Sequence, residues 1–204
     1  MRCVIVGGAE IKNVSAVRGY IRPDDFVVCC DSGLYSAEKL GIIPSLIVGD
    51  FDSHPKPHTD TEIITLPCEK DDTDTVYAVK EAISRGFDDF LILGAAGGRL
   101  DHTLVNVSVL LFLFERQKTA LLVDDYSEME IVGSETKYIT RDYAYFSLIN
   151  ISGTARGISV TGAKYPLENA SIDCSYQYGV SNEVTGERAA VSVKEGNLLL
   201  IKVK

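Results

Sequence analysis

The sequence is short of positive charge. Its 204 residues include 20 lysines and arginines against 29 aspartates and glutamates, for a net charge of −9. A nucleic-acid surface built on basic patches is not expected from such a chain, so we predict no nucleic-acid partner. A polyanionic substrate is still compatible with this composition if a metal ion and backbone amides carry its charge.

Cysteine is scarce and unpatterned. There are five cysteines, an odd number, and none of them form a CxxC pair, although Cys29 and Cys30 are adjacent. This usage predicts reduced thiols in a cytoplasmic protein rather than a disulfide framework. No cysteine or histidine spacing is typical of a zinc site.

Long apolar runs are also missing. The run near the start, residues 3–6, is too short for the hydrophobic region of a signal peptide. The longest apolar segment, residues 104–114, contains Asn106 and Ser108 and is too short to span a bilayer. We therefore expect a soluble intracellular protein without a membrane partner. The glycine motifs GxxxxGK[ST] and GxGxxG of common nucleotide-binding folds are absent as well.

The first part of the chain, residues 1–125, alternates short apolar runs with helical patterns. Strands are predicted at 3–6, 26–30, 46–49, 63–66, 90–93 and 119–123. Helices are predicted at 34–40, ending at Gly41, and from about 74 to Gly86, with Val76, Val79 and Ile83 on one face. A third helix, 102–115, is apolar nearly all round, which indicates burial. This alternation predicts an α/β fold with a mostly parallel sheet and flanking helices.

The pattern changes in residues 126–204. Short β-prone segments at 129–132, 137–139, 143–148, 157–160, 189–193 and 198–203 are not linked by any helical period. Residues 185–188 and 194–197 have the composition of hairpin turns. We predict a second domain here, a small antiparallel β-sandwich or barrel.

Acidic and glycine-rich segments follow the predicted strands of the first domain. Asp50 and Asp52, in the sequence GDFDS at 49–53, are two residues apart, so an extended backbone directs both carboxylates to one side. Paired carboxylates are ligands that Mg²⁺ accepts alongside water and phosphate oxygens. A solvated turn would also explain this composition. Because ligands bind at the carboxyl edge of such sheets, we expect Gly7-Gly8, Asp31 and the two later segments, 70–74 and 97–101, to converge there.

The two later segments add candidate groups. Asp71 and Asp74 are three residues apart at a helix start, where they either face the crevice or serve as ordinary helix-capping acids. The loop 94–101 could cradle phosphate with backbone N–H groups around Gly98, and Arg99 could hold phosphate through its fork of donors. His102 and Asn106, four residues apart, fit a mutually bonded polar pair at least as well as a catalytic histidine.

In order along the chain, these segments resemble the motifs of the thiamine pyrophosphokinase family. The resemblance rests on DSG at 31–33, GDFDS at 49–53, KDDTD at 70–74 and GRLDH at 98–102 with Asn106. GAKYPL at 162–167 and VSNE at 180–183 resemble the thiamine-side motifs of that family. Ser32 and Ala163 depart from the residues usual in the family.

The resemblance implies an enzyme that transfers a pyrophosphoryl group from ATP to the hydroxyl of thiamine, giving thiamine diphosphate and AMP. It implies Mg²⁺ held by Asp50, Asp52 and Asp74, with Asp71 and Asp101 completing the acidic cluster as catalytic groups beside Arg99. Nucleotide-binding residues would be Gly7, Gly8, Asp31, Lys70, Gly98 and Arg99. Tyr165, Ser181 and Asn182 would contact thiamine, in a homodimer whose site is shared between subunits.

Three other functions suit the same residues less well. They are a metal-dependent phosphohydrolase, a kinase for another small alcohol, and a nucleotide sensor without activity. The number of uncompensated carboxylates argues against the sensor, because binding alone does not need them. In an enzyme, Asp71 or Asp101 could take the proton of the attacking hydroxyl.

Overall fold

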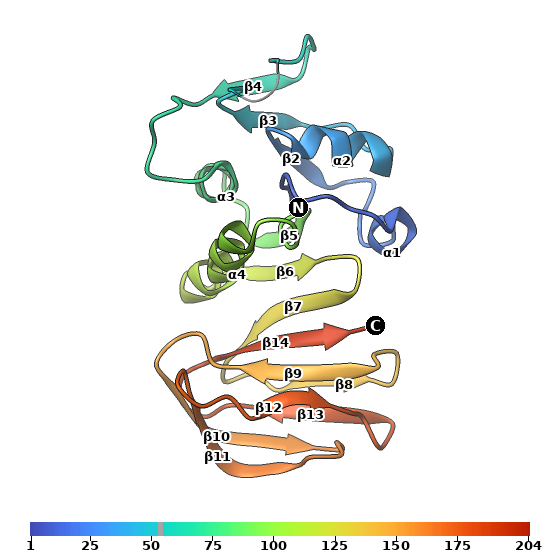
Figure 1. Cartoon of the computed structure of the whole chain (residues 1–204), viewed down its shortest axis with the longest axis vertical. Coiled ribbons are helices and arrows are strands. Elements are labelled where there is room, and N and C mark those ends of the chain that lie inside the picture. Colours follow the sequence, from blue (N-terminus) through green and yellow to red (C-terminus); the bar gives the residue numbers. More distant parts are fainter. Residues whose placement is uncertain (53–54) are drawn as a thin grey trace. The chain divides into compact units, whose positions relative to one another are not determined.

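A computed structural model describes residues 1–52 and 55–204. Ser53, the last residue of the GDFDS segment, and His54 lie outside the described residues. The chain divides into two compact units, Met1–Asp125 and Tyr126–Lys204 (Figure 1). All five cysteines carry free thiols, and Cys3, Cys29 and Cys30 are buried. No helix in the described part of the chain is long and apolar enough to cross a membrane.

The first unit is built on a parallel sheet. Its strands lie in the order β6-β5-β1-β2-β3-β4, and every neighbouring pair is parallel. The residues of β1, β3 and most of β2 and β5 are fully buried, as expected for strands covered on both faces. The strands are β1 (Cys3–Val6), β2 (Phe26–Cys30), β3 (Leu46–Gly49), β4 (Glu62–Thr65), β5 (Asp89–Leu93) and β6 (Thr119–Val123).

Helices cover both faces of this sheet. Helices α1 (Val14–Arg18) and α2 (Gly33–Leu40) lie on one side, and α3 (Asp74–Ser84) and α4 (Leu100–Glu115) on the other (Figure 1). The predicted α/β class is therefore confirmed. Helix α1, only five residues long, was not predicted; Asn13 caps it by accepting a hydrogen bond from the Ala16 N–H. Helix α2 ends as expected, with Gly41 in the left-handed conformation at φ 64°.

The buried faces of α3 and α4 differ from the prediction. In α3 the fully buried residues are Thr75, Ala78, Val79 and Ala82, so the predicted positions Val76 and Ile83 lie at the margins of that face. In α4 the prediction of burial all round is wrong. This helix buries one stripe, from Asn106 to Leu113, because only one face of a helix can pack on a sheet. Leu100 and Leu104 are 70% and 61% exposed.

The second unit is an antiparallel sandwich, as predicted. One sheet has the order β12-β9-β14-β7 and the other β11-β10-β13-β8. Apolar residues from both sheets, including Phe146, Ile158 and Leu200, form its core. The strands are β7 (Ser127–Val132), β8 (Lys137–Thr140), β9 (Tyr145–Ile149), β10 (Thr154–Thr161), β11 (Leu167–Asp173), β12 (Gly179–Asn182), β13 (Arg188–Ser192) and β14 (Leu198–Val203).

Two strands and two turns of this unit depart from the prediction. Strands β11 and β12 were missed because both lie at sheet edges and most of their residues are exposed, which weakens the apolar alternation. The segments 185–188 and 194–197 do not close hairpins. The first leads from β12 to β13 and the second from β13 to β14, and in both cases the chain passes from one sheet to the other.

Candidate active site

The candidate site of the first unit lies where the strand order of its sheet reverses. Strand β1 has β2 on one side and β5 on the other, so the chain leaves β1 and β5 toward opposite helix layers. A crevice opens at the carboxyl ends of strands at such a point. A cavity of about 410 Å³ is found there, lined by residues that follow β1, β2 and β5 and by the start of α3.

Several predicted residues line this cavity. They are Gly8, Asp31, Asp74, Gly98 and Arg99. The cavity volume lies within the range of small-molecule sites. Glu10 and Thr75 also line it and were missed by sequence reasoning. The available signal was their position, Glu10 shortly after β1 and Thr75 directly after Asp74.

Lys70 joins two of the predicted metal ligands. Its Nζ donates a hydrogen bond to Asp50 Oδ2 and lies 3.2 Å from Asp74 Oδ1. The second contact is an ion pair without hydrogen-bond geometry. The bond from Lys70 lowers the pKa of Asp50. Burial raises the pKa of Asp74 above its ordinary value despite Lys70, and the charges of Asp50 and Asp31 add to that effect.

Backbone geometry brings Asp31 close to the end of β3. The Asp31 N–H donates to the Val48 carbonyl at 2.8 Å, and a Cβ at Gly49 would lie 3.2 Å from Asp31 Cβ. A side chain at position 49 would therefore require Asp31 to shift by a few tenths of an ångström. Asp31 and Phe51 have positive φ angles of 38° and 55°, a conformation that costs free energy in non-glycine residues and is often found at functional sites.

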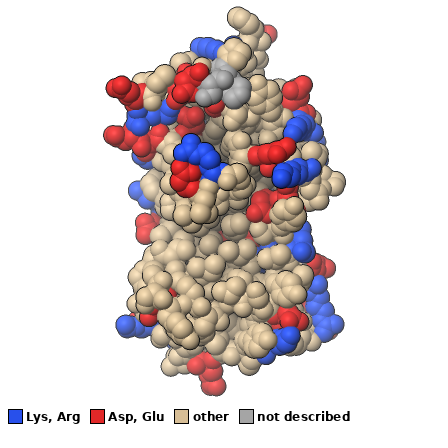
Figure 2. Space-filling view, in the orientation of Figure 1, with Lys and Arg blue, Asp and Glu red and all other residues tan. Residues whose placement is uncertain are grey.

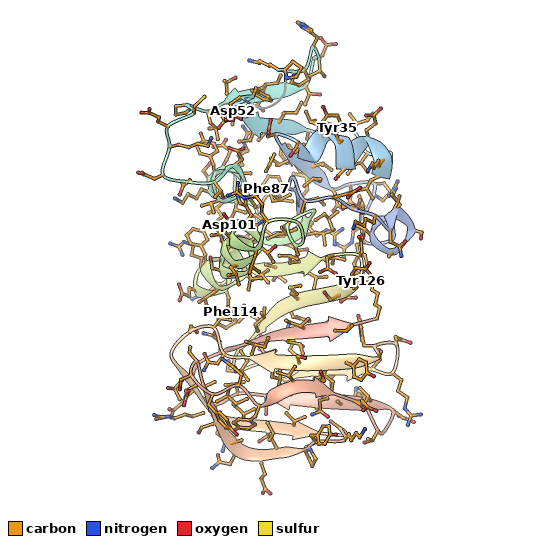
Figure 3. The ribbon with its side chains drawn as sticks, viewed as in Figure 1. Tyr35, Asp52, Phe87, Asp101, Phe114 and Tyr126 are labelled. Carbon is orange, nitrogen blue, oxygen red and sulfur yellow. The ribbon has the colours of Figure 1, made fainter. Side chains whose placement is uncertain are left out.

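Asp52 and Asp71 are less enclosed. Asp52 is exposed on the loop after β3 (Figure 3), and its N–H donates to Asp50 Oδ1 at 3.3 Å. Asp71 is also exposed. Within residues 1–52 and 55–204, no three His, Cys, Asp or Glu side chains form a group arranged to hold a metal ion. The structure thus brings Asp50 and Asp74 together through Lys70.

The glycine-rich segments form the cavity wall. A Cβ at Gly8 would overlap the Ser32 hydroxyl, whereas Gly7 packs against Gly94 at the end of β5 and supports the wall from behind. The Asn106 side chain donates to the Ala95 carbonyl at 2.8 Å, so it fixes this loop instead of pairing with His102. Both Gly97 and Gly98 have positive φ angles, of 99° and 67°.

Arg99 and Asp101 form a bidentate ion pair at the start of α4. Arg99 Nη2 lies 2.5 Å from Asp101 Oδ2, and Arg99 Nε lies 3.1 Å from Oδ1. This pairing lowers the pKa of Asp101 to about 2, with help from the His102 N–H. Both side chains are well exposed, and Asp101 is labelled in Figure 3. The contact is therefore open to exchange with an incoming anion.

The predicted thiamine-side residues gather in the second unit. Tyr165 and Asn182 line a small pocket of about 30 Å³ together with Tyr178 and apolar residues of the sandwich. Asn182 is buried, and its amide bonds the Tyr165 backbone twice, accepting from the N–H at 3.0 Å and donating to the carbonyl at 2.8 Å. Ser181 has a positive φ of 56°, and its N–H donates to Ser147 Oγ.

The surfaces of the two units differ in charge. In Figure 2, side chains of both signs cover much of the α/β unit, whereas most of the visible face of the β-rich unit carries neither sign. Exposed tyrosines are common on the β-rich unit, where Tyr165 and Tyr176 are 58% and 69% exposed. The unit with few charges on that face is the one with the aromatic pocket.

Comparison with known proteins gives a consistent result over both units. Residues 17–122 match the family model described as thiamin pyrophosphokinase, catalytic domain, and residues 135–198 match that of the vitamin B1 binding domain. The thiamine pyrophosphokinase of Bacillus subtilis is 29% identical over 97% of this chain and 96% of its own length.

Solved structures agree with the sequence comparison. The crystal structure of the B. subtilis protein superposes with a TM-score of 0.88 at 27% identity, covering 100% of this chain and 99% of that one. The thiamin pyrophosphokinase of Geobacillus thermodenitrificans gives 0.86 at 30% identity, covering 100% and 98%. With a catalytic-domain match over more than half its length and relatives aligned end to end, this chain belongs to the thiamine pyrophosphokinase family.

Proposed function

We propose that this chain transfers a pyrophosphoryl group from ATP to the hydroxyl of thiamine, giving thiamine diphosphate and AMP. The observation that carries the proposal is the cavity at the strand-order reversal, whose wall combines a glycine-rich loop, Arg99 and the partly buried carboxylate of Asp74. Such transfer needs positioning and charge neutralisation more than covalent chemistry from the protein. This wall supplies cationic, anionic and backbone groups side by side.

The donor set fits a divalent metal ion, Mg²⁺. Asp50 and Asp74 offer hard oxygen ligands at one place, and Asp74 is partly buried with only an ion pair to compensate it. Asp52 would join them from the loop that follows β3. When bound, the metal ion would neutralise phosphate charge as it develops during transfer. Without a cation between them, these carboxylates would repel one another.

Arg99 and Asp101 supply complementary roles. Arg99 would bind phosphate oxygens through its planar fork beside the Gly98 backbone. While Arg99 holds Asp101, that carboxylate is a poor base, since its pKa is about 2. Engaging Arg99 with phosphate would free Asp101 to accept the proton of the thiamine hydroxyl, and Asp71 is the alternative acceptor. Attack would fall in line on the β-phosphorus.

Thiamine would bind through the second unit. Tyr165 and Tyr178 offer aromatic faces to a flat ring, and the acidic first unit suits the cationic thiazolium. We propose a homodimer in which the thiamine-side residues of one subunit complete the acidic site of the other, and a cytoplasmic location. Mixing Asp52→Asn subunits with Asn182→Ala/Tyr165→Ala subunits tests this arrangement. Returning activity supports a shared site; confirmed subunit exchange without activity contradicts it.

Identification of the nucleotide product tests the reaction itself. The protein is incubated with ATP and Mg²⁺, with and without thiamine, and the nucleotides are separated. AMP that forms only with thiamine supports pyrophosphoryl transfer. ADP would indicate a simple kinase, thiamine-independent turnover a phosphohydrolase, and no turnover a nucleotide sensor. Asp60→Asn, on an exposed turn outside the cavity, is the matched control for acid-to-amide changes at the site.

A further inference from the structure

The Lys70 ammonium lies between the carboxylates of Asp50 and Asp74 and is the cation that separates these two negative charges. The three side chains come from different places: Lys70 from the loop before α3, Asp50 from the position directly after β3, and Asp74 from the first residue of α3. Their exposed fractions are 16%, 13% and 22%. Contacts this enclosed and this close are screened much less by solvent than surface ion pairs.

The single ammonium does not balance the negative charge around it. Asp50 takes the hydrogen bond, while Asp74 receives an ion pair at 3.2 Å that lacks hydrogen-bond geometry. Asp31 contributes a further negative charge that acts on Asp74. A doubly charged ion would compensate this group of carboxylates better than one lysine does.

We propose that Lys70 is a built-in counter-cation that a divalent metal ion displaces from Asp50 and Asp74, so that its ammonium is released to bind polyphosphate. The inference rests on the proposed function and adds a coupling to it. Lysine suits this role because its charge is compact and its stem is flexible. The metal ion and the Lys70 ammonium compete for the same carboxylate oxygens. Because metal binding frees the ammonium for phosphate, it raises the affinity for nucleotide, and by linkage nucleotide raises the affinity for metal.

The coupling predicts effects of opposite sign in one variant. Without nucleotide, Lys70→Met should bind Mn²⁺ about tenfold more tightly than the wild type, because the competing charge is gone. In the presence of Mn²⁺, the same variant should bind a non-hydrolysable ATP analogue about tenfold more weakly, because the released ammonium is missing. Both affinities are measured by electron paramagnetic resonance and calorimetry, without turnover.

Lys80→Met is the matched control. Lys80 is exposed on α3 and forms an ion pair with Asp72 at 2.6 Å. Lys80→Met should therefore leave the affinities for Mn²⁺ and for the ATP analogue unchanged. Equal or weaker Mn²⁺ binding by Lys70→Met would overturn the proposal. The Mn²⁺ affinity of Asp50→Asn distinguishes a failure of the displacement proposal from a failure of the proposed function. If Asp50→Asn binds Mn²⁺ more weakly than the wild type while Lys70→Met does not bind it more tightly, the metal site stands and only the displacement is wrong. If Asp50→Asn binds Mn²⁺ normally, both are wrong.

A measurement on the unaltered protein guards against a variant that fails to fold. Acetic anhydride labels free amines, and mass spectrometry reads the extent at each lysine. Mg²⁺ should raise the labelling of Lys70 several-fold, because its ammonium leaves the enclosed ion pairs. Labelling of Lys80 should not change. Labelling of Lys70 that stays constant at saturating Mg²⁺ would overturn the displacement.

Discussion

Asn182 is predicted to act on thiamine through Tyr165. Both polar atoms of its amide are engaged with the chain: Oδ1 accepts from the N–H groups of Tyr165 and Glu183, and Nδ2 donates to the Tyr165 carbonyl. The side chain is only 6% exposed. Asn182→Ala would therefore remove the side-chain bonds that hold the Tyr165 backbone, although the backbone bond from Lys164 to Glu183 remains.

The size of the effect follows from the bonds lost. A net hydrogen bond contributes about 0.5–1.5 kcal/mol, so losing the two bonds to Tyr165 costs about 2 kcal/mol. In a chain of this length, each kcal/mol shifts Tm by roughly 2–4 °C. Because 1.4 kcal/mol corresponds to a factor of about ten, we expect the KM for thiamine to rise about tenfold if most of this cost falls on ring placement. Asn182→Asp keeps the acceptor oxygen but places a carboxylate oxygen against the Tyr165 carbonyl at a buried position, so it should not restore the KM lost in Asn182→Ala.

A double-mutant cycle provides the assay. The kcat/KM for thiamine is measured for Asn182→Ala, Tyr165→Ala and the double variant. If Asn182 works through Tyr165, the double variant should be no worse than Tyr165→Ala alone. Fully additive losses would refute this reasoning and make Asn182 a direct thiamine contact. Asn197→Ala, which loses a bond to Ser152 elsewhere in the unit, should lower Tm without changing KM.

Three further predictions concern the first unit. Asp50→Asn or Asp52→Asn should lower turnover about a hundredfold or more with little loss of folded structure by circular dichroism; wild-type-like turnover at limiting Mg²⁺ would contradict the metal assignment. Arg99→Lys should lower kcat about tenfold because lysine lacks the planar fork, and an unchanged kcat would indicate a structural arginine. Arg99→Met should raise the pKa of Asp101 from about 2 toward about 3.9, so at pH 3 the carboxyl becomes largely protonated; a nuclear magnetic resonance titration that shows no shift would contradict the pairing.

The fold class could be predicted because its signals are local. Buried parallel strands such as β1 and β3 are short apolar runs in the sequence. Gly41 follows the apolar pattern of α2, and the structure has it in the left-handed conformation that ends the helix. Prediction was wrong where burial depends on neighbours. The apolar residues of α4 do not reveal that Leu104 is exposed while Leu110 is buried, because that difference arises from which face meets the sheet.

The candidate site could be predicted as a set of segments but not as a set of contacts. Strand ends are readable in sequence, so Asp31, Asp50 and the glycine loop could be assigned to one edge. Side-chain partners depend on distances across elements, which no spacing encodes. Lys70, expected to bind phosphate, forms ion pairs with Asp50 and Asp74, and Asn182, expected to contact thiamine, bonds the backbone of Tyr165. Both sets of contacts have the same physical cause: a half-buried polar group takes the partner that the folded chain already supplies, and a ligand must compete with that partner to bind.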